Sequence, residues 1–315
     1  CMEKYYSVPV AVIVFNRVVL AEKMLNCLEK IKPRQLFVIS DGARKEIPGE
    51  QEKVSEVRAL FDQPSWECEV HREYANENMG CDHRVPSGIS WIFEYVDSAV
   101  ILEDDCIPST DFFNYAEEML KKYQNDPKVM MIAGSNLMKK YDIADSCCFT
   151  ARTYTWGWAT WKRAWEHYCG DESEWKRILK DGTFSKIYSL RTRYYVKKEF
   201  GYYMKRNRCP WDYLWWISCM GAGGLCAVPK VNLITNVGFG VGATHTQNKG
   251  DYEGEVFPLD FPLQYPEQVR RDRKFDRYDA GLNPPWKIIR GIRKIVKCCN
   301  TCKLKAKMIN YISGV

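Results

Sequence analysis

The chain has 315 residues, of which 46% are hydrophobic and 14% aromatic, so it can bury an ample core and is not disordered throughout. Its formal net charge of +6 is confined to the end: residues 281–315 hold eight Lys or Arg and no acid, leaving 38 of the 46 basic residues against all 40 acidic ones. A slightly acidic body argues against a nucleic-acid-binding core, whereas a basic end is typical of attraction to an anionic surface.

No apolar run approaches the roughly 20 residues that span a bilayer, and the N-terminal residues lack a signal-peptide pattern. We therefore expect the catalytic part to be cytoplasmic. The 14 cysteines are scattered without paired spacing, which favours reduced thiols. Cys299 and Cys302 form a single C-x-x-C without a second pair nearby, so a structural zinc is not expected.

The first forty residues predict a strand–helix–strand unit. Residues 8–15 form a continuous apolar run, typical of a parallel strand covered on both faces, and a helix-spaced apolar pattern and a second strand, 36–40, follow. Ligands of such open sheets bind beyond the carboxyl ends of the strands. We therefore expect Asn16, Arg17 and Asp41 at a ligand-binding edge, with a plain turn as the alternative for Asp41-Gly42.

A charged helix over about 51–61 and a strand over 66–74, nearer the edge of the sheet, come next. The turn at Asn78-Met79-Gly80 opens a helix that ends near Tyr95. Because helix N-termini attract phosphate, Arg84 in the first turn is a candidate donor-binding residue. A solvent-facing arginine is the alternative.

Three consecutive carboxylates, Glu103-Asp104-Asp105, follow the apolar run Val100–Leu102. Adjacent acids repel one another and gain nothing from packing, so the usual reason to fix them at a buried strand end is a hard cation and the anion it carries. A solvated strand end is the alternative. A helix capped by Ser109 or Thr110 and a core strand over 129–133 complete this half of the chain.

Residues 147–240 are rich in Trp and Tyr, which favours either a core or faces on which sugar rings stack. Asp212 lies between Trp211 and Tyr213, where partial burial would raise its pKa and make it a better base. A structural Asp paired with Arg206 or Arg208 is the alternative. A glycine-rich loop over 236–246 ends near His245, which could complete the coordination of a metal ion or simply be exposed.

The remaining chain divides into two segments. Residues 251–283 predict a loosely ordered linker, because charges and prolines dominate. From Trp286 onward, apolar residues recur at helical spacing among basic ones, which predicts an amphipathic tail over 284–315 that lies on an anionic membrane or docks on the domain. Before them, residues 2–135 and 136–250 are expected to form the nucleotide-sugar-binding and acceptor-binding halves of one domain.

In order along residues 8–246, these motifs resemble the GT-A glycosyltransferases, above all the group of the Golgi mannosyl-glycoprotein N-acetylglucosaminyltransferase and its bacterial relatives. The likeness is most specific at Glu103-Asp104-Asp105. It implies an α/β GT-A fold, a Rossmann-like, mostly parallel sheet flanked by helices. Tyr213 departs from the pattern, because the relatives have a second acid there, which puts the position of the base or the type of acceptor in question.

The resemblance also implies roles for single residues. Asp105 would hold Mn²⁺ or Mg²⁺, with His245 as a late ligand, and Asp212 would be the catalytic base. Arg17 would lie near the nucleotide. The donor contacts would come from Glu103 and Asp104, to sugar and ribose, and from Asp41, to uracil.

The expected function is metal-dependent, inverting transfer of a sugar from a nucleotide-sugar to a saccharide or lipid-linked saccharide. The donor is expected to be UDP-linked, and the reaction to serve cell-surface glycan synthesis on the inner face of the membrane. One alternative is a retaining transferase in which Asp212 is structural. Another is a sugar-phosphate nucleotidyltransferase, although Phe15-Asn16-Arg17-Val18 lacks the glycine-rich loop usual there. A non-catalytic sugar-binding module would not need three acids at a strand end.

Overall fold

Strands and helices alternate through the first 135 residues, as the apolar pattern predicts. The computed structural model describes residues 5–138, 141–188, 190–204, 209–238 and 254–282. The strands are β1 (Val10–Val14), β2 (Gln35–Ser40), β3 (Glu69–Tyr74), β4 (Ser98–Glu103), β5 (Cys106–Pro108), β6 (Val129–Ala133), β7 (Cys147–Thr150), β8 (Trp158–Trp161), β9 (Leu225–Pro229) and β10 (Ile234–Asn236). The helices are α1 (Val18–Ile31), α2 (Glu50–Leu60), α3 (Cys81–Tyr95), α4 (Thr110–Lys122), α5 (Lys162–Trp165), α6 (Ser173–Lys180), α7 (Thr183–Ile187), α8 (Leu190–Met204), α9 (Trp211–Gly221) and α10 (Arg273–Leu282).

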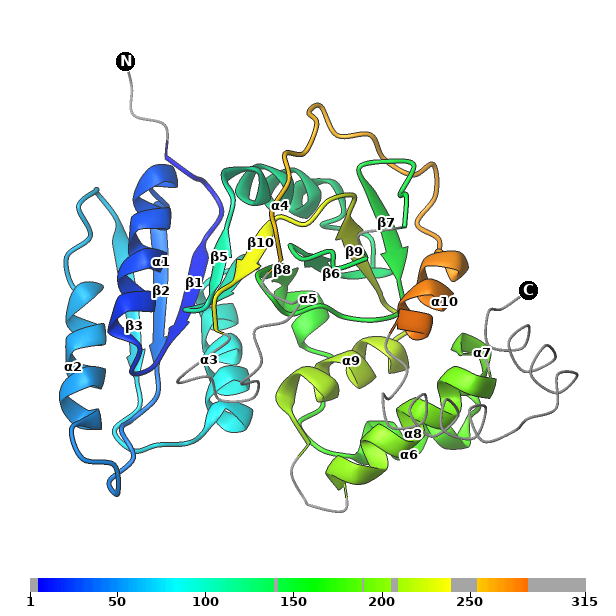
Figure 1. Ribbon diagram of the computed structural model, residues 1–315, viewed down its shortest axis with the longest axis horizontal. Coiled ribbons are helices and arrows are strands. Elements are labelled where there is room, and N and C mark those ends of the chain that lie inside the picture. The colour runs from blue at the N-terminus through cyan, green and yellow to red at the C-terminus, as the bar shows by residue number, and fades with distance from the viewer. Residues whose placement is uncertain (1–4, 139–140, 189, 205–208, 239–253, 283–315) are drawn as a thin grey trace, which may run out of the picture.

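Eight of the strands form one sheet in the order β3-β2-β1-β4-β8-β6-β9-β7 (Figure 1). Strands β3, β2, β1 and β4 are parallel, as are β6 and β9, whereas β8 runs antiparallel to both β4 and β6, and β7 antiparallel to β9. Only β8 and β7 therefore oppose the common direction. The predicted α/β class, with a mostly parallel sheet flanked by helices, is confirmed.

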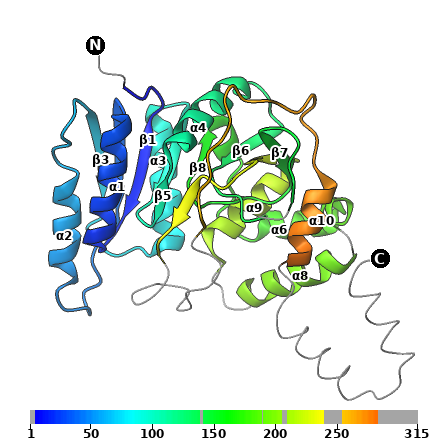
Figure 2. The same ribbon diagram turned by 45° about the horizontal axis from the view of Figure 1, so that its top comes forward.

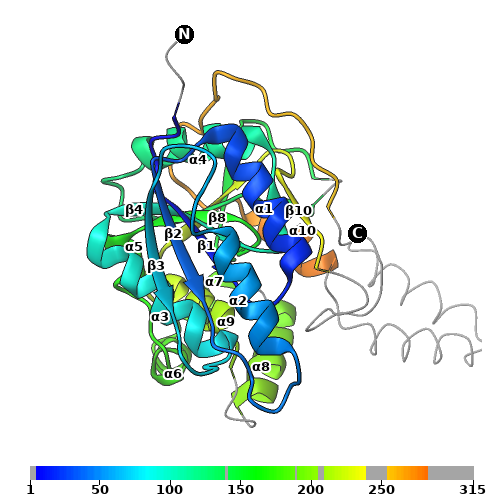
Figure 3. The same ribbon diagram turned by 90° about the vertical axis from the view of Figure 1, so that its left-hand side faces the viewer.

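Helices cover both faces of the parallel half of the sheet. Figure 3 shows α1 and α2 on one side of β2 and β3, and α3 on the other. Residues Leu36–Ser40 of β2 are buried one after another without alternation, which is why a continuous apolar run was needed there. Strand β3 lies at the edge, as its sequence predicts, and none of its residues is fully buried.

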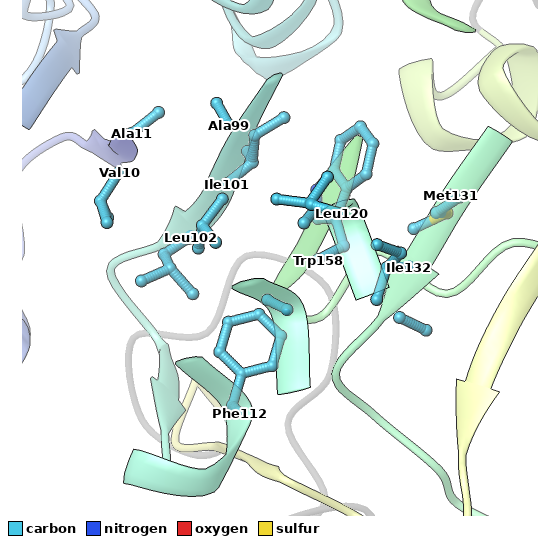
Figure 4. Packing of buried hydrophobic residues seen from close by; sticks show 14 of the residues in the cluster. Val10, Ala11, Ala99, Ile101, Leu102, Phe112, Leu120, Met131, Ile132 and Trp158 are labelled. Carbon is cyan, nitrogen blue, oxygen red and sulfur yellow. The ribbon is translucent and has the colours of Figure 1, made fainter. Parts of the chain in front are cut away.

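The aromatic part of the chain mainly fills the interior. Figure 4 shows Trp158 of β8 next to Ile101 of β4 and Ile132 of β6, at the centre of the core. A second cluster unites α6 to α9, where the rings of Trp175 and Phe200 stack with centroids 4.5 Å apart. Of the two interpretations of the aromatic clusters, packing accounts for most of these rings.

Residues 254–282 are not the loosely ordered linker that their charges and prolines suggested. Leu259 and Leu263 are buried in the main core, and the backbone N–H of Ser146 donates to the carbonyl of Gln264 at 2.9 Å. Helix α10 then packs near β7 with Phe275 fully buried. The segment has little regular structure before α10, yet single buried side chains hold it against the core. Their spacing follows neither a helical nor a strand period, so the sequence does not reveal them.

The predicted basic tail, residues 284–315, lies outside the described residues, as does His245. Within the described part of the chain, no helix combines the length and the apolar character required to cross a membrane.

Candidate active site

The carboxyl ends of β1, β2 and β4 meet at one edge of the sheet, because these strands are parallel neighbours. Ile13 of β1 is level with Ile39 of β2 and with Glu103 of β4. The polar residues that leave these strands are therefore brought together, as the sequence predicted: Asn16, Arg17, Asp41, Glu103, Asp104 and Asp105.

Arg17 binds two of the three consecutive acids. Its Nε donates to Asp104 Oδ2 at 3.2 Å and its Nη2 to Asp104 Oδ1, while its Nη1 donates to Asp105 Oδ2 at 2.9 Å. The side chain of Asp104 is only 3% exposed, against 18% for Asp105. The bidentate contact fixes Asp104, whereas Asp105 keeps part of its carboxylate open to a ligand.

Burial and mutual repulsion make the acids reluctant to ionise. Burial, followed by the charges of Asp105, Asp104 and Asp212, raises the pKa of Glu103 to about 8. Burial also raises the pKa of Asp104 to about 6, against the opposing effect of Arg17. Glu103 thus ionises less readily than an ordinary glutamate, whereas Asp104 remains mainly ionised at neutral pH.

The start of the glycine-rich segment lies directly on Asp105. Antiparallel pairing of β5 with β10 brings Val237 to the acids, where its backbone N–H donates to the carbonyl of Asp105 at 2.8 Å. A Cβ atom on Gly238 would lie 2.3 Å from Asp105 Oδ2, so no other residue fits there without moving that carboxylate. The sequence showed the glycines but not which residue they contact.

Asp212 lies in the first turn of α9, close enough for its charge to contribute to the raised pKa of Glu103. Burial raises the pKa of Asp212 to about 6, partly opposed by the backbone N–H groups of Tyr213 and of Asp212 itself. The expected desolvated acid is therefore present. The arginines that the structural alternative would pair with it, Arg206 and Arg208, lie outside the described residues.

A second acid positions this helix. Asp82, at the start of α3, accepts a hydrogen bond from the backbone N–H of Trp211 at 3.3 Å, and its charge further raises the pKa of Asp212. The sequence analysis did not single out Asp82, although an acid in the first turn of a predicted helix is a recognisable candidate for such a contact.

Arg152 is another residue that the sequence analysis did not single out. It forms an ion pair with Asp279 of α10 at 3.2 Å, and its guanidinium lies 5.5 Å from the ring centre of Trp216 on α9. Its positive charge partly offsets the rise in the pKa of Asp212. Nothing local in the sequence links residues so far apart.

The carboxylate of Asp41 is fully occupied by the fold. It accepts from the backbone N–H groups of Gly42, Met79 and Gly80, each at 2.8 Å, and from Asn78 Nδ2 at 3.1 Å. These bonds use its four acceptor positions. Asp41 therefore holds the turn at 78–80, and the expected contact with uracil would have to displace one of them.

Two other candidates form hydrogen bonds within the fold. Arg84 is only 3% exposed, donates to the carbonyl of Ser40 at 3.2 Å and forms an ion pair with Glu73. Its guanidinium is therefore buried and does not lie where it could contact a phosphate, as the sequence analysis expected. The helix start directs it inward, where it joins β2 to β3. Asn16 donates to Glu50 Oε1 at 2.8 Å, and Arg44 lowers the pKa of Glu50 to about 2.

The described residues contain no group of three or more His, Cys, Asp or Glu side chains arranged to enclose a metal ion. They do contain a partly exposed carboxylate, Asp105, beside a second, Asp104. Mg²⁺ sites of nucleotide enzymes typically use one or two carboxylates and take further ligands from the substrate phosphates and water. The site thus fits a hard cation that binds together with a nucleotide, and not a preformed all-protein cage.

No family model matches the chain, and no curated protein matches it by sequence. Among the solved structures that share a weak likeness with the chain are a cytidylyltransferase, a galactosyltransferase and a UDP-glucose pyrophosphorylase. A cytidylyltransferase from Leptospira borgpetersenii serovar Hardjo-bovis (strain JB197) is 11% identical, with a TM-score of 0.31, over 51% of this chain and 61% of its own. The galactosyltransferase LgtC, in complex with donor and acceptor sugar analogs, is 9% identical, with a TM-score of 0.30, over 57% and 66%.

A UDP-glucose pyrophosphorylase complexed with UDP-glucose is 10% identical, with a TM-score of 0.25, over 47% of this chain and 64% of its own. Each match therefore spans less than two thirds of the other chain. Likenesses this low establish neither a shared fold nor a shared reaction.

Proposed function

We propose that the protein is a metal-dependent, inverting glycosyltransferase that moves a sugar from a nucleotide-sugar, most simply a UDP-sugar, to a hydroxyl of a saccharide or lipid-linked saccharide. The observation that carries the proposal is the combination of two kinds of acid in one site. A strand-end triplet, Glu103-Asp104-Asp105, suits a diphosphate and its cation, and a separate, desolvated Asp212 suits proton removal.

Asp105 would hold Mn²⁺ or Mg²⁺ jointly with the donor diphosphate, and the bound cation would offset the negative charge that develops on the leaving group. Arg17 keeps Asp104 ionised and in place beside it. Glu103 would contact the donor sugar beside them. His245 stays a candidate ligand from the sequence alone.

Asp212 would accept the proton of the acceptor hydroxyl, because a carboxylate with a pKa of about 6 is ionised at neutral pH yet more basic than an ordinary aspartate. The acceptor oxygen would form its bond to C1 as the bond from C1 to the diphosphate oxygen breaks on the opposite face. This single displacement inverts the anomeric centre. A retaining reaction would not require Asp212 as a base.

Thermal-shift measurements with a panel of nucleotide-sugars, with and without Mn²⁺, test donor and metal together. We expect one donor class to raise the melting temperature only when Mn²⁺ is present. Asp105→Ala should abolish this shift while the melting temperature of the free protein stays near that of the parent, because a strand-end carboxylate contributes little to packing. An unchanged, Mn²⁺-dependent shift in Asp105→Ala would refute the metal assignment.

Product analysis then separates the two stereochemical outcomes. Incubation with the donor found by thermal shift and a soluble saccharide acceptor, followed by NMR of the anomeric proton, should show the configuration opposite to that of the donor. Retention would move Asp212 to a structural role. Formation of nucleotide-sugar from nucleoside triphosphate and sugar phosphate would instead favour a nucleotidyltransferase.

A further inference from the structure

Helix α8 exposes large apolar side chains on one face. Leu190 is 78% exposed, Tyr194 59% and Tyr202 52%. They recur at intervals of four or eight residues, so they lie on the same side of the helix as Lys198. Val196 and Phe200 lie on the opposite side and are buried in the cluster shared by α6 to α9. These two buried side chains attach α8 to the fold.

The same face is basic. Lys197 and Lys198 are exposed within this row of apolar side chains. Across residues 173–204, which span α6 to α8, eight Lys or Arg stand against three Asp or Glu, although the chain before residue 281 has a small excess of acid. We call Leu190, Tyr194, Lys197, Lys198 and Tyr202 the α8 face.

Its charge limits what can cover the α8 face. The C-terminal residues 283–315, which follow α10 in the sequence, carry eight Lys or Arg and no acid, so they would be repelled by it. A second copy of the chain would present the same basic face, so symmetric pairing is opposed as well. Charge complementarity therefore requires an anionic partner.

The apolar side chains decide between anionic partners. A polyanion such as RNA offers phosphates but no apolar layer for Leu190, whereas the headgroup region of an anionic bilayer accepts Lys in its outer part and Leu and Tyr at the acyl boundary. Helix α8 also lies away from α1 and α2, toward the other end of the molecule (Figure 2).

We propose that the α8 face binds the surface of an anionic membrane, as a contact site built into the folded domain and separate from the basic C-terminal residues. Leu190 and the two tyrosines insert among the headgroups, and Lys197 and Lys198 contact lipid phosphates. This inference does not depend on the proposed reaction, because membrane binding is measured without donor or acceptor.

The test uses the full chain with vesicles of phosphatidylglycerol and phosphatidylcholine, or of phosphatidylcholine alone, and follows amide hydrogen exchange by mass spectrometry. With anionic vesicles at low salt, amides of α8 should exchange more slowly, while those of α1 stay unchanged. If the protein binds the vesicles and α8 exchanges as before, another part of the chain makes the contact and the proposal is overturned.

The variant Leu190→Glu/Lys197→Glu/Lys198→Glu should lower the partition coefficient onto anionic vesicles by at least about tenfold, because both attraction and insertion are removed. The matched control is Val19→Glu, which alters a side chain 62% exposed on α1 and should bind as the parent does. Melting temperatures of both variants show that the fold is retained. Equal binding of the triple variant, or equal binding of the parent to neutral vesicles, also overturns the proposal.

Discussion

At the scale of single residues, the site depends on two carboxylates whose environments differ. Asp105 is partly exposed and bonded to Arg17, which suits a ligand-binding role, whereas Asp212 is desolvated and has a pKa of about 6. Enzymes commonly give two carboxyl groups different environments, so that one has a raised pKa and transfers a proton while the other stays accessible and stabilises charge. Both residues were found from the sequence, because strand ends and aromatic flanks are local signals.

Asp212→Asn should lower turnover at least about a hundredfold, with donor binding near that of the parent, because only the proton acceptor is lost. In the parent, kcat should fall as pH decreases through about 6, since a protonated Asp212 cannot accept a proton. Initial rates across pH, together with calorimetric donor titration, measure both effects. Turnover within a few-fold of the parent would mean that another group, or no group, acts as base.

The stability of the same variant provides a control that does not involve activity. The folded pKa of Asp212, about 6, lies above the ordinary 3.8, so folding favours the protonated acid and this contribution to stability is lost as pH rises through 6. Asn carries no charge at any pH. The variant should gain up to about 3 kcal/mol of unfolding free energy over the parent at pH 8, and almost nothing at pH 4. Equal stabilities at pH 8 would show that Asp212 is not desolvated.

At the scale of elements, the sequence predicted β1, β2, β4 and β6 well, because an apolar run bounded by turn residues is a local property. It failed where the partner of a residue is distant. Arg84 has the position of a phosphate ligand at a helix start, yet Glu73 and the Ser40 carbonyl draw it inward. The packing of 254–282 and the Arg152–Asp279 pair were equally invisible, because both join segments more than a hundred residues apart.

Gly238→Ala tests the contact between the loop that follows β10 and the acids. The added Cβ would overlap Asp105 Oδ2, so we expect at least about a tenfold loss of nucleotide affinity with little change in melting temperature. Gly201→Ala is the control, since a Cβ there meets no atom within 4 Å. If both variants bind nucleotide equally, this loop does not set the position of Asp105.

Phe275→Ala tests whether α10 is part of the folded domain. Removing this fully buried ring should cost about 3–5 kcal/mol of unfolding free energy, as other large core truncations do. The neighbouring exposed Lys274→Ala should change it by less than about 0.5 kcal/mol. Chemical denaturation measures both, and a small effect of Phe275→Ala would restore the interpretation of the segment as a linker.

At the scale of the whole molecule, charge is distributed unevenly between a near-neutral body and a strongly basic C-terminal end. We propose from the sequence alone that residues 284–315 form an amphipathic membrane-binding tail and that the enzyme works at the inner face of the cell membrane. Such a location would suit a lipid-linked acceptor.

Flotation of a chain that ends at Gly281 checks this part of the proposal. At low salt, the full chain should float with anionic but not with neutral vesicles, and removal of eight basic residues should weaken binding steeply. If the shortened chain still binds anionic vesicles at a lower level, the remaining binding would be due to the α8 face. Identical flotation of the two chains would remove any role for the tail.

The position of β8 has a consequence for how the chain is made. This strand lies between β4 and β6, although it comes after both in the sequence. While the ribosome has delivered only the first 135 residues, β4 therefore ends in an unpaired edge and β6 has no neighbour to join. The half that carries Arg17 and the acid triplet cannot mature as an independent unit during synthesis. A fragment ending at residue 135 is expected to aggregate, and the protein is expected to fold only as one continuous chain through β9.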